Sequence, residues 1–118
     1  MHTRIGVKRV TVSQLSEKLN LKVVAMYDPD REVEGAYAGD LLSWVMGNAS
    51  EGNAFVTIMT NINVIAVATL IDMSCVIFCE GVEIPQEVLD AAAQKEVNLL
   101  SSPLPSFEMC GELYGVLK

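Results

Sequence analysis

The sequence predicts an α/β fold with three layers (α/β/α), in which helices cover both faces of a mostly parallel sheet. Apolar, β-branched segments alternate with helix-like segments along the chain. The apolar segments are continuous, which is typical of strands that are buried on both faces. Four of them run into a polar helix-start signal. These four signals are Gly39-Asp40, Thr60-Asn61, Gly81 to Pro85, and Ser101-Ser102-Pro103.

Length and composition predict one domain over residues 1–118 with a surface left for a partner. A chain of 118 residues can bury a core of its own without disulfides or a structural metal. Its hydrophobic content of 51% exceeds what that core needs. The net charge of −7 disfavours nucleic acid, because binding to the phosphate backbone requires clustered Lys and Arg.

The first third of the chain predicts one short helix and two strands. Residues 11–19 begin with Thr11 as N-cap and Gln14 three positions later, which is the spacing of a capping box. Residues 21–26 are β-branched and apolar, and residues 33–37 alternate like a second strand. Turn-forming residues separate the two segments, so they are candidates for neighbouring strands in the sheet.

The segment 41–48 predicts a short helix that is covered on two sides. Asp40 is a suitable N-cap, and Gly47-Asn48 tolerate a left-handed helix end. The helix has almost no polar face, so we expect one side against the core and the other against a second subunit. The predicted interface residues are Leu41, Leu42, Trp44 and Val45.

The remainder predicts three further strand and helix pairs. The expected strands are 55–59, 75–79 and 97–100. Helices are expected from Asn61 or Asn63 to about residue 71, from Pro85 in the first helical position to about residue 95, and over 106–117. Residues 62–79 are apolar enough to raise the question of a membrane span, but Asn63 and Asp72 interrupt them. We therefore expect a buried helix followed by a buried strand, and no membrane association.

No catalytic constellation or metal site is predicted. Cys75 and Cys79 lie about 13 Å apart on one face of a strand, too far to chelate one metal, and we interpret them as core residues. His2, the sole histidine, lies at a terminus and is a poor candidate for a general base. Asp40 and Glu80 support only a minority hypothesis of acid–base catalysis, since nothing fixes their separation. With three cysteines and no secretory pattern, we expect a cytoplasmic protein without cofactors.

The helix starts provide the main candidate binding site. Thr60, Asn61, Asn63, Ser101 and Ser102 place hydroxyl and amide groups beside free backbone N–H groups, which together favour an anion such as a phosphate or carboxylate. Ordinary helix capping is the alternative for each of these residues. Asp30-Arg31 has a similar alternative, because it also fits a solvated turn with a local salt bridge.

Several segments of the chain together resemble the DRTGG domain family. They are Asp30-Arg-Glu-Val-Glu-Gly35, Gly39-Asp-Leu-Leu-Ser-Trp-Val-Met46, Thr60-Asn-Ile-Asn-Val-Ile-Ala-Val-Ala68 and Asn98-Leu-Leu-Ser-Ser-Pro103. The name-giving Asp-Arg-Thr-Gly-Gly motif keeps only Asp30, Arg31 and Gly35. This family is similar to the N-terminal domain of HPr kinase/phosphorylase. The resemblance implies a dimeric α/β/α domain that regulates or senses a ligand and carries no catalytic residues.

Two functional hypotheses follow from these observations. In the first, the chain is a non-catalytic homodimer that binds a small anionic metabolite or nucleotide through Arg31, Thr60, Asn61, Asn63, Ser101 and Ser102. In the second, it is a structural adaptor that binds itself or a partner protein through the apolar segment 41–46 and holds no small ligand. A short member of this family is expected to act through another chain or through its own oligomer.

Overall fold

The computed structural model describes residues 9–118 and contains five helices and five strands within that range. The five strands form one sheet in the order β1-β5-β4-β3-β2. Three of its four strand pairs are parallel, and only β1 runs antiparallel, against β5. This confirms the predicted mostly parallel sheet. His2 lies outside the described residues.

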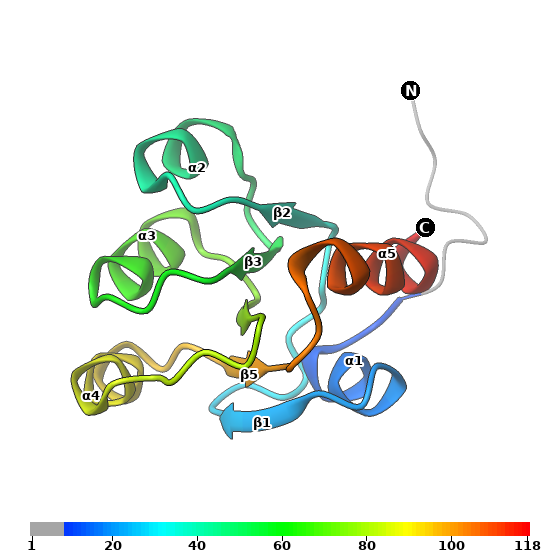
Figure 1. The fold of residues 1–118 in the computed structure, drawn as a ribbon, viewed down its shortest axis with the longest axis horizontal. Helices are drawn as coiled ribbons and strands as arrows, with labels where there is room; N and C mark the ends of the chain where they lie inside the picture. Colours follow the sequence, from blue (N-terminus) through cyan, green and yellow to red (C-terminus); the bar gives the residue numbers. More distant parts are fainter. Residues whose placement is uncertain (1–8) are drawn as a thin grey trace.

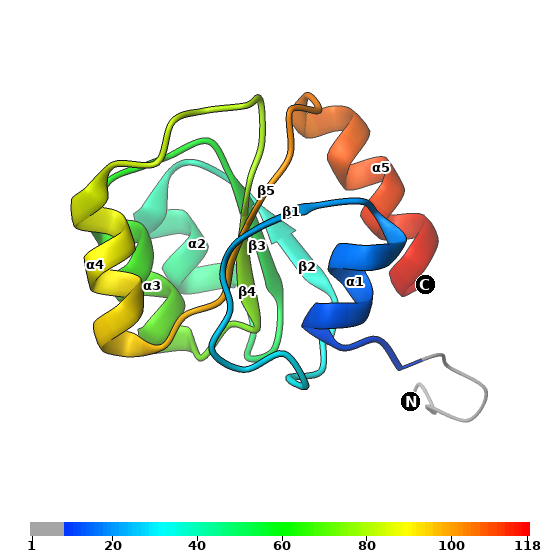
Figure 2. The same cartoon turned by 90° about the horizontal axis from the view of Figure 1, so that it is seen from below.

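The strands are β1 Lys22–Ala25, β2 Ala36–Ala38, β3 Ala54–Thr57, β4 Cys75–Phe78 and β5 Leu99–Ser101. From β2 to β5 each successive strand is added on the same side of the previous one, so the connecting helices all fall on one face. The remaining two helices cover the other face. Figures 1 and 2 show the resulting three layers, with α2, α3 and α4 on one side of the sheet and α1 and α5 on the other.

The helices are α1 Val12–Lys18, α2 Leu42–Asn48, α3 Asn63–Ile71, α4 Gln86–Lys95 and α5 Ser106–Leu117. The predicted capping box of α1 is present, with Gln14 N donating to the Thr11 hydroxyl and Thr11 N donating to the Gln14 side chain. The predicted last helix, 106–117, is confirmed at both ends. Pro85 is the N-cap of α4 rather than its first helical residue, so the helix begins one residue later than predicted. No helix in the described range is long and apolar enough to span a bilayer.

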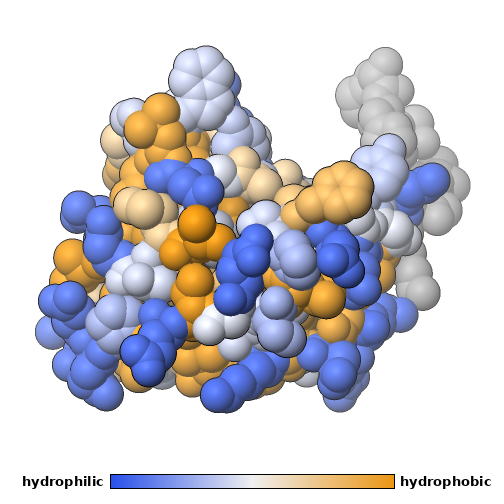
Figure 3. Space-filling view, viewed as in Figure 1, coloured by the Kyte–Doolittle hydropathy of each residue, from blue (hydrophilic) through white to orange (hydrophobic). Residues whose placement is uncertain are grey.

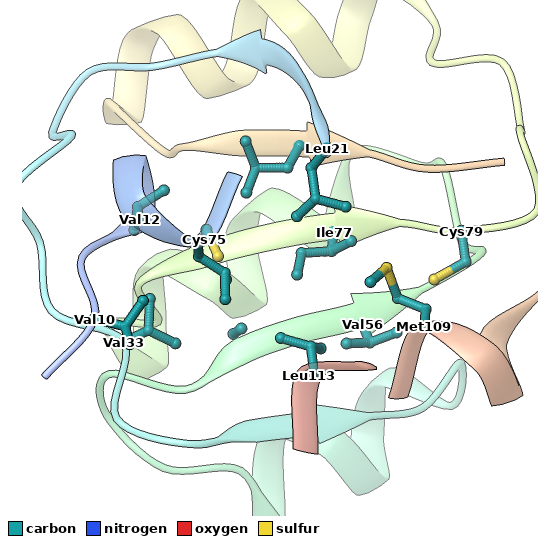
Figure 4. Close-up of a cluster of buried hydrophobic side chains, with 13 residues drawn as sticks. Val10, Val12, Leu21, Val33, Val56, Cys75, Ile77, Cys79, Met109 and Leu113 are labelled. Carbon is teal, nitrogen blue, oxygen red and sulfur yellow. The ribbon is translucent and has the colours of Figure 1, made fainter. Parts of the chain in front are cut away.

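Two separate cores fill the two faces of the sheet because side chains alternate along each strand. On one face Cys75, Ile77 and Cys79 pack with Met109 and Leu113 of α5 (Figure 4). The core on the other face is built from the intervening strand residues and from α2, α3 and α4. Burial raises the pKa of the Cys75 thiol to about 12 and that of Cys79 to about 11. Both cysteines are therefore core residues, as predicted.

The two strands predicted to be neighbours lie at opposite edges of the sheet. β1 is one edge, beside β5, and β2 is the other, beside β3. The segment between them crosses the whole sheet and is held on the way by α1, because Val12 N donates to Arg31 O and Val33 N donates to Val10 O. The predicted strand 21–26 contains β1, whereas the predicted strand 33–37 shares only residues 36 and 37 with β2. The local turn signal carried no information about which strands would pair.

Candidate functional site

The carboxyl ends of four parallel strands meet at one edge of the sheet, where the sequence places its four helix-start signals. Because β2, β3, β4 and β5 are parallel, the loops that follow them lie together at this carboxyl edge. Backbone hydrogen bonds connect neighbouring loops: Gly81 N donates to Ser102 O at 3.1 Å, and Glu80 N donates to Leu104 O at 2.9 Å. The four helix-start signals therefore lie at one edge of the sheet.

Asp40 holds two strand ends together and does not cap α2. Its Oδ1 accepts from the Thr57 hydroxyl at 2.8 Å and from Ile58 N at 2.9 Å. The residue at the N-cap position of α2 is Leu41, whose side chain has no acceptor to offer. The prediction of Asp40 as N-cap was wrong, because the carboxylate binds the neighbouring strand β3 in place of the helix that follows it.

The first residues of α5 receive a carboxylate from a different loop. Glu80, which adopts a left-handed conformation with φ of 63°, accepts from Ser106 N at 3.2 Å through Oε2. An acidic side chain at a helix N-terminus is favourable because it satisfies a free N–H and interacts with the helix dipole. Asp40 and Glu80 therefore both act as structural ties at this edge, and both bring negative charge to it.

The predicted ligand residues that follow β3 are accessible. Asn61 and Asn63 are exposed, and Thr60 is half-buried. Asn61 Oδ1 accepts from Asn63 N at 2.7 Å, which is a local turn at the start of α3. Because both asparagines are exposed, this turn leaves polar surface of their side chains accessible.

The two serines after β5 differ in accessibility. Ser101, the last residue of the strand, is half-buried, whereas Ser102 is buried and its hydroxyl accepts from Leu104 N at 3.1 Å. Ser102 also lines a cavity of about 360 Å³ together with residues of the turn after α1 and of α5. The lining residues are Lys18, Leu19, Asn20, Ser102, Pro103, Leu104 and Glu112.

Lys22 also lies at this edge, although the sequence pattern gives no sign of it. Because β1 is antiparallel to β5, its first residue lies at the carboxyl edge, where Lys22 is directly opposite Ser101. Directly opposite residues of an antiparallel pair project on the same face with Cβ atoms about 5 Å apart. Lys22 is exposed and gives this corner of the acidic edge a positive charge. Its position depends on the strand pairing, which the sequence pattern does not specify.

Arg31 lies at the opposite edge of the sheet from the other predicted ligand residues. Its guanidinium donates to Asp72 Oδ1 at 3.0 Å and to Asp72 O at 2.8 Å. The hydrogen bond that Arg31 donates to the Asp72 carboxylate is the largest cause of the raised pKa of Arg31. Asp72 ends α3 and precedes β4, so this contact is at the amino ends of the strands. The salt bridge of Arg31 is not local, because it joins residues 41 positions apart in the sequence. The structure therefore does not bring Arg31 together with the other predicted ligand residues, which are Thr60, Asn61, Asn63, Ser101 and Ser102.

The four predicted interface residues also separate into two groups. Leu41 and Trp44 are exposed, while Val45 is fully buried in the core between α2 and the sheet. Leu42 packs partly against that core and lines a shallow hollow between α2 and α3. Val45 is therefore unavailable to a second subunit, because it is the residue through which α2 contacts its own sheet.

Comparisons with known proteins identify relatives of this fold. The family model described as "HPr Serine kinase N terminus" matches residues 59–117. A solved structure of the CBS and DRTGG domains of the regulatory region of Clostridium perfringens pyrophosphatase, complexed with the activator diadenosine tetraphosphate, is similar with a TM-score of 0.67 at 16% identity. The match covers 92% of this chain and 46% of that one, so the chain spans about half the length of that structure. No curated protein matches.

Proposed function

The chain belongs to the HPr serine kinase N-terminus family, and on that premise we propose that it is a non-catalytic regulatory module that binds a small anionic ligand, a nucleotide being the first candidate. The observation that carries this proposal is the carboxyl edge, where parallel strands end in loops with accessible hydroxyl and amide groups. Ligands of open α/β sheets bind at this edge in general. The similar pyrophosphatase region was solved with a nucleotide activator, which supports the choice of nucleotides as probes.

The proposed binding surface runs from Lys22 and Ser101 at one end to Thr60, Asn61 and Asn63 at the other. The two ends are separated by β4, so β5 and β3 lie about 10 Å apart at roughly 4.8 Å per strand. A single phosphate cannot touch both ends, whereas a nucleotide is long enough to do so. Ser102 supports the surface through its bond to Leu104, and Arg31 acts elsewhere.

The distribution of charge favours an orientation in which the anionic part of the ligand lies near Lys22. Asp40 and Glu80 repel phosphate near β2 and β4, and Lys22 attracts it beside β5. The ligand's uncharged part then lies toward α3. This orientation also predicts that nucleotides bind more tightly when Mg²⁺ reduces their charge, since the edge is otherwise acidic.

Thermal unfolding with adenine nucleotides, diadenosine tetraphosphate and inorganic phosphate tests this proposal. A ligand at 100 times its Kd adds about 2.7 kcal/mol, which corresponds to about 10 °C for a chain of this length. We expect a shift with a nucleotide and little with phosphate alone. Lys22→Gln should reduce the shift, and Lys95→Gln, at the opposite edge, should leave it unchanged. No shift with any compound would refute ligand sensing, and a shift lost only with Lys95→Gln would refute this location.

The second candidate function is an adaptor for protein association that holds no small ligand. The exposed Leu41 and Trp44 favour it, because large apolar side chains gathered on one surface mark interaction sites. Light scattering of Trp44→Asp distinguishes the outcomes. A folded monomer from an oligomeric parent supports an interface on α2, and an oligomer that does not change excludes it.

A further inference from the structure

We propose that two copies of this chain associate through the outer edge of β2, joining their sheets into one and packing α2 and α5 against their counterparts. This inference goes beyond the ligand proposal and names a surface for the homodimer that the sequence leads us to expect. It differs from the sequence prediction, which used only residues of α2. The surface consists of Ala36 to Ala38 of β2 together with one flank of each of the two helices.

On its outer edge, β2 has backbone groups that pair with no other strand of the described residues. No other strand of residues 9–118 pairs with it on that side. Gly39 N donates to Val56 O, and Gly35 O accepts from Ala54 N, so these two residues direct their groups inward to β3. Because the direction alternates along a strand, Ala36 and Ala38 direct their N–H and C=O groups outward. Such an edge is a template for another strand.

The pattern of these groups is self-complementary. If a two-fold axis passes midway between Tyr37 and its counterpart, antiparallel pairing sets Ala36 opposite Ala38 of the partner subunit, and Ala38 opposite Ala36 of the partner subunit. Each of these is a hydrogen-bonded pair, in which both residues exchange their N–H and C=O groups. All outward groups of β2 are then satisfied in both copies, and an isologous contact of this kind closes as a dimer.

Both faces of the sheet offer apolar side chains beside this edge. On α2, Val45 faces the sheet and Leu42 and Met46 line the hollow toward α3, so Leu41 and Trp44 lie on the flank beside β2. On the other face, Cys110, Tyr114 and Leu117 of α5 line a hollow of about 410 Å³ above Ala36 and Ala38. Figure 3 shows the surface hollowed between α2 and α5 at this place. The small alanine side chains leave this space open.

The exposed area is of the size that a dimer uses. Leu41 is 66% exposed, Trp44 62% and Tyr114 70%. At roughly 200 Å² for a large side chain, these three expose about 400 Å², which is half of the roughly 800 Å² per partner in a standard interface. The edge strand and the half-buried Cys110 and Leu117 add to it.

Ala38→Pro tests the strand pairing most directly. Proline removes the outward N–H of Ala38 and leaves the bonds to β3 intact, since those use Gly35, Tyr37 and Gly39. Ala38→Ser keeps the N–H and is the matched control. Tyr114→Glu tests the flank on α5, and Val23→Glu places the same charge on an exposed apolar position at the opposite edge of the sheet. Circular dichroism confirms that each variant is folded.

We expect the parent chain to have twice the monomer mass of 12.8 kDa by light scattering, and Ala38→Pro and Tyr114→Glu to be monomers. Both controls should remain dimers. A monomeric parent at about 100 µM, or a folded Ala38→Pro that stays dimeric, overturns the proposal. If Ala38→Pro does not fold, hydrogen exchange of the parent decides: protection of the Ala36 and Ala38 amides that increases with protein concentration supports the pairing, and protection independent of concentration overturns it. The nucleotide shift is measured separately, so its absence would refute the ligand proposal and not the dimer.

Discussion

Asn98 connects the turn after β1 to the amino ends of β4 and β5, and its loss should destabilise the whole domain. The side chain is 3% exposed and makes four hydrogen bonds. Its Oδ1 accepts from Tyr27 N and Asp28 N, both at 2.9 Å, and its Nδ2 donates to Asp28 O at 2.8 Å and Ser74 O at 3.1 Å. Every polar atom of the amide is therefore used, and one residue holds segments 70 positions apart.

Asn98→Ala removes all four bonds at once. At about 1 kcal/mol net for each bond, the loss is about 4 kcal/mol, and hydration of the exposed Tyr27 and Asp28 backbone lowers it to about 3 kcal/mol. For 118 residues this corresponds to a Tm about 12 °C lower. Thermal and urea unfolding measure the change. Asn48→Ala, which removes one bond at an exposed helix end, is the control and should cost less than about 1 kcal/mol.

Asn98→Asp separates the hydrogen-bond pattern from the volume of the side chain. The substitution keeps the oxygen that accepts two hydrogen bonds. It replaces the amide nitrogen that donates to Asp28 O and Ser74 O by a second carboxylate oxygen. Burial and these carbonyl groups raise the pKa of the introduced carboxyl in the folded state, so the folded state binds a proton more tightly than the unfolded state does. Stability relative to the parent should therefore recover as the pH falls from 7 toward about 4. An Asn98→Asp variant as stable as the parent at pH 7 would refute the assigned bonds.

Three further predictions concern single contacts. Arg31→Ala should lower the free energy of unfolding in urea by about 1 kcal/mol, because the partly exposed ion pair with Asp72 is screened by water. A loss above about 3 kcal/mol would contradict a partly exposed salt bridge. Gly52→Ala should lower the free energy of unfolding by about 2 kcal/mol, because Gly52 has φ of +83° and the new Cβ would lie 2.8 Å from Glu34 Oε2. Adding Glu34→Ala should recover part of this loss, and no recovery would disprove the clash. Burial raises the pKa of the half-buried Cys110 thiol and of the two fully buried cysteines, so alkylation of the monomeric Ala38→Pro variant should be slow at pH 7 and faster as the pH rises. Cys110 should be modified first, and equal rates for all three cysteines would refute the packing.

The elements of the sheet interior were predictable because their sequence pattern is local. β3 and β4 are short apolar runs, and their alternate residues fill two different cores, so burial on both faces shows directly in the composition. The capping box of α1 is likewise contained in four consecutive residues. In each case the physical cause of the structure lies within the segment itself.

The edges of the sheet and the tertiary ties could not be predicted in the same way. Nothing within residues 21–37 indicates that β1 pairs with a strand more than 70 residues later. Asp40 has the residue type and position of an N-cap, yet a stronger set of donors, Thr57 and Ile58, comes from a neighbouring strand. The same limit applies to the candidate site, where Lys22 depends on the antiparallel pairing and Arg31 on its partner Asp72.

The strand order also has a consequence for how the chain folds. From β2 to β5 every new strand pairs with the one before it, so this part of the sheet can grow by short loop closures. β1 can join only after β5 exists, and its contacts close a loop of more than 70 residues. We therefore expect α1 and β1 to dock last, with unfolding rates, rather than folding rates, responding to substitutions in that segment. The corner that carries Lys22 would then be completed in the final folding step. A ligand bound at this corner would slow the undocking of α1 and β1.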